Sequence, residues 1–208
     1  MYVRSENDSI YRVYIPLIYK IGMPQTKPII SIENVVASAT VNQTINLNHI
    51  TQLFPDVEYH PDQFPGLVFR LKAPKTATLI FSSGKMVCTG SKSEEQAIKA
   101  VKTVVAKLRK AGIEIDNEPI IEIQNIVASA SLGGKIHLEQ AARVLPRSMY
   151  EPEQFPGLIH RMLDPKTVIL LFASGKLVCT GAKKEEEVYR AVNNLHIVLE
   201  EKGLMMYR

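Results

Sequence analysis

The sequence has no tryptophan, only two cysteines among 208 residues, and no apolar run long enough to cross a bilayer as a helix. Two cysteines without a Cys-x-x-Cys spacing exclude the common zinc and redox motifs. Cys88 and Cys179 occupy equivalent places in two copies of the tetrapeptide VCTG. We therefore interpret them as small buried apolar residues in a reducing compartment, and we expect no disulfide, no metal site and no membrane span.

A strong excess of either charge is also absent. The formal net charge is +4, a mild preference for anionic partners that does not by itself indicate nucleic-acid binding. Apolar residues make up 46% of the chain, which is ordinary for a globular protein and sufficient for a buried core. Length and composition together predict one compact domain or two small ones.

What the chain does contain is a tandem repeat. The pentapeptide QFPGL occurs at residues 63–67 and 154–158, with a bulky Phe beside a Pro-Gly turn signal, so each Phe is expected to project. The same offset of 91 residues aligns two further pairs of segments without a gap: NVVASA (34–39) with NIVASA (125–130), and APKTATLIFSSGKMVCTG (73–90) with DPKTVILLFASGKLVCTG (164–181). Two units predict a pseudo-twofold molecule rather than a solenoid.

We expect repeat one over residues 29–115 and repeat two over residues 120–206. Residues 1–28 precede them as an extension. Either this extension adds a strand, or the native protein starts at Met23, which would also serve as an initiator. Within repeat one, β-branched residues, an Asn46 cap and Pro55 predict the element boundaries. The expected elements are strands at 29–40, 67–71, 77–82 and 85–89, a short helix at 47–54, and a long helix that opens at residue 91 and ends at Gly112; the second long helix is expected from about 184 to 202.

The predicted strands lack the polar alternation of a sheet with one face in water. In the strand at 77–82, for example, Leu79 and Phe81 point to one side and Ile80 to the other. Four helices can cover only one face of a sheet of about ten strands, so the other face is expected to be bare and apolar, beyond the patches that monomers usually expose. Its predicted residues are Val36, Leu79, Phe81, Val87 and Thr89, with Val127, Leu170, Phe172, Val178 and Thr180 as their counterparts.

Asn34 and Asn125 share the alternation register of this face and are expected near the pseudo-twofold axis. Six basic residues are expected around it: Arg70, Lys75, Lys85, Arg161, Lys166 and Lys176. The bare face has three interpretations: dimerisation or a second helical layer, a ligand cavity or active site, and DNA binding. A concave apolar sheet with two amides and a basic rim suits the minor groove, where an amide can donate to A·T acceptors and an apolar wall disfavours the guanine amino group.

The enzyme interpretation finds no support in the sequence. It contains no glycine-rich phosphate loop, no paired carboxylates in the motifs and no Ser/His/Asp grouping, so we expect neither catalysis nor a cofactor. The five histidines share no position between the repeats and have no metal-ligand spacing. We expect each at the surface or at its boundary: His49, His60, His137, His160 and His196.

The motifs NIVASA, EPEQFPGLIHRM and DPKTVILLFASGKLVCTGAK, together with the duplication, resemble the TATA-box-binding protein family in its archaeal form over about residues 30–206. The resemblance implies an α+β saddle of ten antiparallel strands with four helices on the convex face. It also implies a general transcription factor in the archaeal cytoplasm, associated with the nucleoid. Its implied partners are A·T-rich promoter DNA, transcription factor B and RNA polymerase. This family is itself a standard example of minor-groove binding with inserted side chains.

Family roles carry over by position, as the resemblance implies. Inserted rings match Phe64, Phe81, Phe155 and Phe172; central hydrogen-bonding groups match Asn34, Asn125, Thr89 and Thr180; apolar base contacts match Val36, Val127, Val87, Val178, Leu79 and Leu170; phosphate-side contacts match Arg70, Arg161, Ser83, Ser174, Lys85 and Lys176. Glu151 and Glu153 match the site that docks transcription factor B, and repeat one has His60 and Asp62 there instead.

The two predicted long helices also differ in charge: residues 91–112 include six basic and two acidic residues, and residues 182–203 include four basic and five acidic residues. This asymmetry favours a partner or flanking DNA near the first helix.

Overall fold

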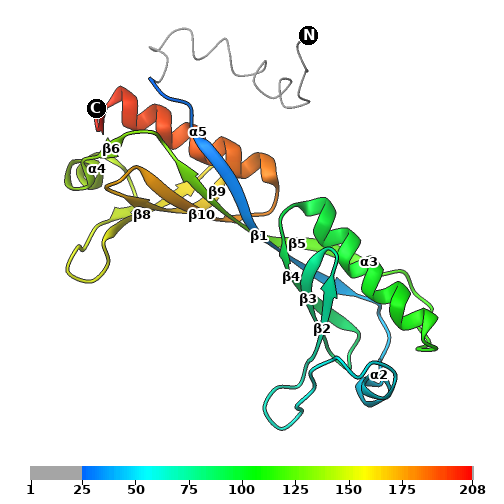
Figure 1. Cartoon of the computed structure of the whole chain (residues 1–208). Helices are drawn as coiled ribbons and strands as arrows, with labels where there is room; N and C mark the ends of the chain where they lie inside the picture. Colours follow the sequence, from blue (N-terminus) through cyan, green and yellow to red (C-terminus); the bar gives the residue numbers. More distant parts are fainter. Residues whose placement is uncertain (1–24, 208) are drawn as a thin grey trace, which may run out of the picture.

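The two repeats form one saddle, with strands along its underside and the long helices above them (Figure 1). The computed structural model describes residues 25–207. Most of the expected N-terminal extension, residues 1–24, lies outside the described residues. Strands β1 (Ile29–Thr40) and β5 (Ile120–Ser131) pair antiparallel at the centre, from Ile29 opposite Ser131 to Thr40 opposite Ile120. The repeats therefore share one continuous sheet.

Nine strands make up this sheet, in the order β2-β3-β4-β1-β5-β10-β9-β8-β7, and every pair is antiparallel. The remaining strands are β2 (Leu67–Lys72), β3 (Lys75–Ile80), β4 (Lys85–Ser91), β7 (Ser148–Met149), β8 (Gly157–Leu163), β9 (Lys166–Phe172) and β10 (Lys176–Ala182). A separate two-stranded sheet joins β6 (Lys135–Ile136) to β11 (Met205–Met206).

The main sheet has nine strands where the resemblance implied ten, because the outermost strand is reduced in repeat one. Met149 of β7 pairs with Ile159, whereas the equivalent Glu58 and Val68 form only an isolated bridge. The Ser148 hydroxyl donates to the Leu145 carbonyl at 2.8 Å and tethers β7 to the preceding helix. Val57 stands at this position in repeat one and has no hydroxyl with which to do so.

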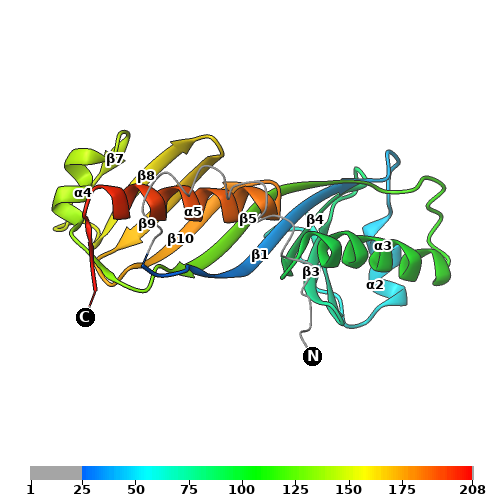
Figure 2. The same ribbon diagram turned by 90° about the horizontal axis from the view of Figure 1, so that it is seen from above.

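Four helices are formed by the described residues: α2 (Leu47–Leu53), α3 (Glu94–Lys110), α4 (Leu138–Val144) and α5 (Glu185–Glu201). The long helices α3 and α5 run across the convex side of the sheet, and the short ones lie at its outer ends (Figure 2). The Asn46 side chain accepts from the His49 amide at 3.1 Å, and the Ser93 hydroxyl accepts from the Gln96 amide at 3.1 Å. These caps satisfy first-turn amides that have no partner within their helix. The predicted saddle architecture is confirmed.

The convex face of the sheet packs against the long helices and forms one contiguous core across both repeats. Cys88 and Cys179 are free thiols buried in this core, as predicted. Burial raises the pKa of the Cys179 thiol to about 11. This thiol therefore stays protonated and unreactive at neutral pH.

The expectation that every histidine lies at the surface or its boundary is wrong for two of them. His160 and His196 are only 7% and 1% exposed. In the repeat alignment they replace Phe69 and Val105, which are both core residues. Burial lowers the pKa of both imidazoles, because removal from water disfavours the charged form. His49, His60 and His137 are exposed.

Candidate nucleic-acid interface

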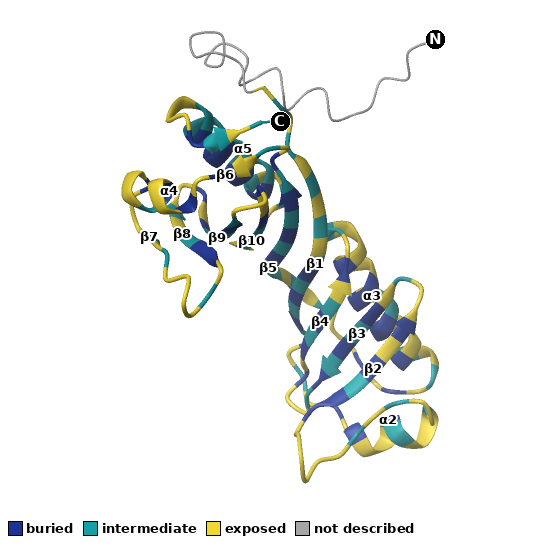
Figure 3. Ribbon diagram, turned by 60° about the vertical axis from the view of Figure 1, so that its left-hand side comes forward, coloured by how far each residue is buried: buried dark blue, intermediate teal, exposed yellow. Residues whose placement is uncertain are grey.

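No helix of the described residues covers the concave face of the sheet (Figure 1). Along its inner strands, fully buried residues alternate with half-buried ones (Figure 3). The buried row faces the long helices, and the half-buried row faces the hollow of the saddle. The structure places the whole predicted set in the half-buried row: Val36, Leu79, Phe81, Val87, Thr89, Val127, Leu170, Phe172, Val178 and Thr180.

Asn34 and Asn125 lie on the two central strands in fixed orientations. The Asn34 Oδ1 accepts from the Gly90 amide at 2.7 Å, and its Nδ2 donates to the Thr89 hydroxyl at 3.0 Å. Asn125 repeats the arrangement with Gly181 at 2.7 Å and Thr180 at 3.1 Å. A backbone N–H can only donate, so it fixes which amide atom is the oxygen. Each Nδ2 keeps a second donor hydrogen for which the described residues provide no partner.

Two pairs of phenylalanines stand at the two ends of this face. Phe64 and Phe81 are edge-to-face, with ring centroids 5.8 Å apart, and Phe64 is 41% exposed. Phe155 and Phe172 have the same arrangement at 5.9 Å. In repeat one, Phe64 lies in the loop before β2 and Phe81 directly follows β3. In repeat two, Phe155 lies in the loop before β8 and Phe172 is the last residue of β9. Such a pair presents a rigid apolar edge.

The glycine of QFPGL makes this ring packing possible. A Cβ atom on Gly66 would lie 2.6 Å from Phe64 Cε1 and 3.0 Å from Phe81 Cε1. On Gly157 the corresponding distances, to Phe155 and Phe172, would be 2.7 Å and 3.0 Å. A side chain here would therefore displace the rings, and the two copies of Phe-Pro-Gly are each one packed unit.

The predicted basic rim is exposed, but it is not symmetrical. Its members Arg70, Lys75 and Lys85, and their counterparts Arg161, Lys166 and Lys176, are all exposed, as are Ser83 and Ser174, the other predicted phosphate-side contacts. Arg70 Nε lies 3.0 Å from Glu58 Oε1, and this ion pair raises the pKa of Arg70 and lowers that of Glu58. Met149 replaces Glu58 in repeat two, and Arg161 has no ion-pair partner among the residues that the structure describes.

One carboxylate beside the concave face was missed by the sequence reasoning. Glu33 Oε1 accepts from the Ser129 hydroxyl at 2.6 Å, and Oε2 lies 3.1 Å from Lys92 Nζ. Both contacts lower the pKa of Glu33, the hydrogen bond from Ser129 most of all. The pairing of β1 with β5 shifts between Ile32 and Asn34. Strict alternation along β1 predicts that Glu33 lies on the opposite face of the sheet from Asn34. The shift in pairing breaks this alternation at Glu33, and nothing in the sequence reveals the shift.

Glu151 and Glu153 are exposed in the loop that leads to Phe155. The Glu151 carbonyl accepts from the Phe155 amide at 2.9 Å and closes the loop. In repeat one, the His60 carbonyl does the same for the Phe64 amide at 2.9 Å. Both loops project from the side of the saddle opposite the long helices (Figure 1). The loops therefore share a backbone turn but carry different side chains.

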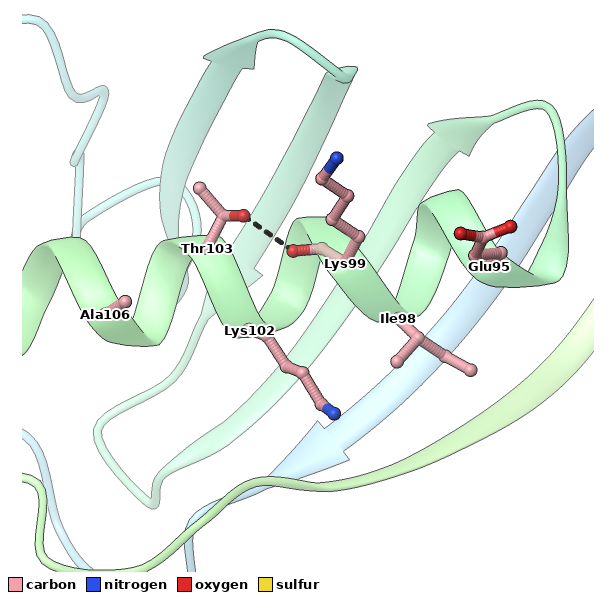
Figure 4. A pocket seen from close by; sticks show the side chains of 6 residues that line it. All are labelled: Glu95, Ile98, Lys99, Lys102, Thr103 and Ala106. Atoms are coloured by element: carbon pink, nitrogen blue, oxygen red, sulfur yellow. Dashed lines mark hydrogen bonds between the residues drawn. The ribbon is translucent and has the colours of Figure 1, made fainter.

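The enzyme interpretation requires a concave site with convergent polar groups. A hollow of about 460 Å³ lies on the outer side of α3, where Ile98, Lys99 and Lys102 line it (Figure 4). A single helix forms it, without the convergent polar groups of a small-molecule site. Within residues 25–207, no three His, Cys, Asp or Glu side chains are grouped to hold a metal ion. None of the helices formed by the same residues has the length and apolar character needed to cross a membrane.

The fold and the face together define a class: two-repeat saddles with helices on one side and a bare apolar sheet on the other. The chain matches the model of the family described as transcription factor TFIID (or TATA-binding protein, TBP), over residues 29–111 and again over residues 120–202. It belongs to this family, whose members are DNA-binding general transcription initiation factors rather than enzymes.

Similar proteins agree with the family match. The chain is 57% identical over 172 residues to the TATA-box-binding protein of Pyrodictium occultum, covering 83% of this chain and 86% of that one. It is 54% identical over 169 residues to the protein of the same name from Sulfurisphaera tokodaii, covering 81% and 85%. The solved structure of Methanococcus jannaschii TBP has a TM-score of 0.74 and 47% identity, covering 83% of this chain and 98% of that one.

Proposed function

We propose that this chain binds the TATA box of A·T-rich promoters in the minor groove and bends it by inserting Phe64, Phe81, Phe155 and Phe172 between base steps. It then recruits transcription factor B and RNA polymerase at the nucleoid. Each repeat, 29–115 or 120–206, supplies half of the interface. The observation that carries the proposal is the bare apolar face with an edge-to-face phenylalanine pair at each end.

The energetics favour bending because the protein surface is apolar. Unstacking a base step costs a few kcal/mol, and bending the site costs roughly 1–6 kcal/mol more. Burial of the apolar face against a widened groove, at about 25 cal/mol per Å², offsets both costs. Flexible TA steps lower the deformation cost, so the protein prefers TATA by deformability as well as by contact.

Base recognition follows from the amides. The unpaired donor hydrogens of Asn34 and Asn125 match the A N3 and T O2 acceptors of A·T pairs. A guanine amino group would meet Val36 or Val127 and would find no acceptor there. Such a group would lose its hydrogen bond to water without replacement, which costs about 1–3 kcal/mol.

The exposed rim provides contacts to phosphates. The positive charge of the basic side chains gives an affinity for DNA that falls as the salt concentration rises and that does not depend on base sequence. The proposed phosphate contacts are Arg70, Ser83, Lys85, Arg161, Ser174 and Lys176.

Glu151 and Glu153 have another role. A carboxylate beside phosphates disfavours DNA binding, so their place on the loop next to Phe155 fits a basic protein partner, transcription factor B. His60 and Asp62 give the other loop a different charge, which lets that partner select one end of the complex.

A competition titration tests the proposal. A labelled TATA duplex is bound by the protein and competed with an unlabelled TATA duplex, a G·C-substituted duplex, or the TATA single strand. The proposal predicts that only the TATA duplex competes well. Stronger competition by the single strand would indicate a surface that stacks unpaired bases, and equal competition by the G·C duplex would contradict minor-groove selection.

A further inference from the structure

The first residues of the two long helices exchange hydrogen bonds. The Glu94 amide donates to Glu185 Oε1 at 2.9 Å, and the Glu185 amide donates to Glu94 Oε1 at 2.6 Å. Glu94 begins α3 and Glu185 begins α5. The residues are 91 positions apart, which is the repeat offset, so the exchange follows the pseudo-twofold symmetry of the chain.

The exchange satisfies groups that would otherwise lack a partner. The first amides of a helix have no acceptor within that helix, and the helix dipole favours negative charge there. A carboxylate commonly caps its own helix, but here each one caps the helix of the other repeat. Both residues are half-buried. Charge-assisted hydrogen bonds of this kind are about twice as strong as neutral ones.

The position of the exchange gives it mechanical leverage. The repeats join through β1 and β5 in the sheet, and the starts of α3 and α5 meet on the convex side of that seam (Figure 1). A change in the angle between the repeats pivots about the strands. Such a change moves the helix ends apart or together and simultaneously changes the separation of the two phenylalanine pairs.

We propose that Glu94 and Glu185 are positioning residues that fix the angle between the repeats. They hold the Phe64–Phe81 and Phe155–Phe172 pairs at the spacing of the DNA site. That the pairs insert into DNA rests on the function proposed above, whereas the angle itself does not depend on it. A surface that is already in its binding geometry loses less conformational freedom on association.

The angle can be measured without DNA. Spin labels are attached to Lys72→Cys and Leu163→Cys, which are equivalent exposed positions in the two repeats and belong to neither DNA nor partner site. Native Cys88 and Cys179 are buried and stay unlabelled. Electron–electron double resonance then gives the distribution of distances between the repeats. We expect a narrow distribution for this doubly labelled protein.

The Glu94→Ala/Glu185→Ala variant removes both bonds and is expected to broaden or shift the distribution. The matched control is Glu95→Ala/Glu186→Ala, which removes the same charge one residue further along each helix, at exposed positions. It should keep the narrow distribution. Glu94→Gln/Glu185→Gln keeps the acceptor oxygens and should also stay narrow. A Glu94→Ala/Glu185→Ala distribution equal to the control's would overturn the proposal.

Two further readouts separate the alternatives. Each single alanine variant removes one bond and should show an intermediate width, which keeps the test decisive if the double variant folds poorly. Affinity for a TATA duplex should fall about threefold to tenfold in the double alanine variant relative to the control. A broadened distribution with unchanged affinity would refute the positioning role. If the parent protein binds no TATA duplex, the proposed function fails, while the distance distributions still decide whether the exchange fixes the angle.

Discussion

The two repeats are nearly the same on the concave face and differ elsewhere. Asn34 and Asn125 make matching contacts at 2.7 Å, and the phenylalanine pairs have matching separations of 5.8 and 5.9 Å. At the outer edge, by contrast, Met149 replaces Glu58, and the loop carboxylates Glu151 and Glu153 occupy the positions that His60 and Asp62 have in repeat one. A symmetrical face suits a nearly symmetrical duplex but cannot orient itself on it. We therefore assign orientation to the parts that differ between the repeats.

The concave face is where symmetry should produce equal effects. Replacing Phe155 and Phe172 by Ala should remove the kink at one end of the DNA, and replacing Phe64 and Phe81 should remove it at the other. Burial of each ring is worth about 1.5–3 kcal/mol, so a double variant that lacks two rings should lose at least about 100-fold in affinity, as measured by duplex titration. Thermal unfolding is the control, since a melting temperature far below the parent's would make these rings core residues.

Substitution of Gly66 or Gly157, the glycines that lie against the two phenylalanine pairs, should also have equal effects in the two repeats. Gly66→Ala or Gly157→Ala places a methyl group within 2.6 or 2.7 Å of a phenylalanine ring. The displaced rings should lower the affinity for a TATA duplex by about tenfold, because the wedge loses its packed geometry. Titration of both variants checks this, with near-ultraviolet circular dichroism reporting on the rings. Unchanged affinity in both would show that the ring positions in the free protein are irrelevant to binding.

The projecting loops are where the repeats should behave differently. Glu151→Lys/Glu153→Lys should leave binary DNA affinity equal or slightly higher and weaken the ternary complex. Exposed ion pairs contribute about 0.2–1 kcal/mol each, so we expect a loss of only a few fold. His60→Lys/Asp62→Lys is the matched control in repeat one. Titration of transcription factor B onto preformed protein–DNA complex should separate the two variants, and equal ternary affinity for wild type and the Glu151/Glu153 variant would remove that pair from the partner site.

The buried histidines give repeat two a histidine-linked pH dependence, because repeat one has Phe69 and Val105 at the same positions. Their pKa is lowered on folding by burial, so the unfolded chain binds protons more readily. The free energy of unfolding should therefore be highest above the pKa of a histidine in the unfolded chain, about 6.5, and should decrease as the pH falls below that value. Urea unfolding at pH 8 and pH 5 measures the loss. His160→Phe/His196→Val, which copies repeat one, should reduce it, and an unchanged pH dependence in that variant would place the effect elsewhere.

Much of the fold could be predicted because the duplication supplies two readings of each element. Period-two alternation separated Leu79 and Phe81 from Ile80. In the structure Ile80 is buried, whereas Leu79 and Phe81, which follows the end of β3, are half-buried. The buried histidines could have been found in the same way, since their aligned positions hold Phe69 and Val105. The roles of the predicted DNA and partner residues remain proposals.

Other features depend on contacts between distant segments and leave no local pattern. The register shift that exposes Glu33 arises from the pairing of β1 with β5. The capping exchange between Glu94 and Glu185 requires two helix ends to meet in space. In both cases, the sequence has ordinary acidic residues, and only the tertiary structure assigns them neighbours.

The most direct test of the account is the shape of the bound DNA. A duplex with a central TATA element carries a donor dye at one end and an acceptor at the other, and energy transfer is followed during titration with the protein. We predict a rise in transfer on binding, because the four inserted rings bend the duplex and shorten its end-to-end distance. Saturable binding with no change in transfer would contradict insertion by the phenylalanine pairs.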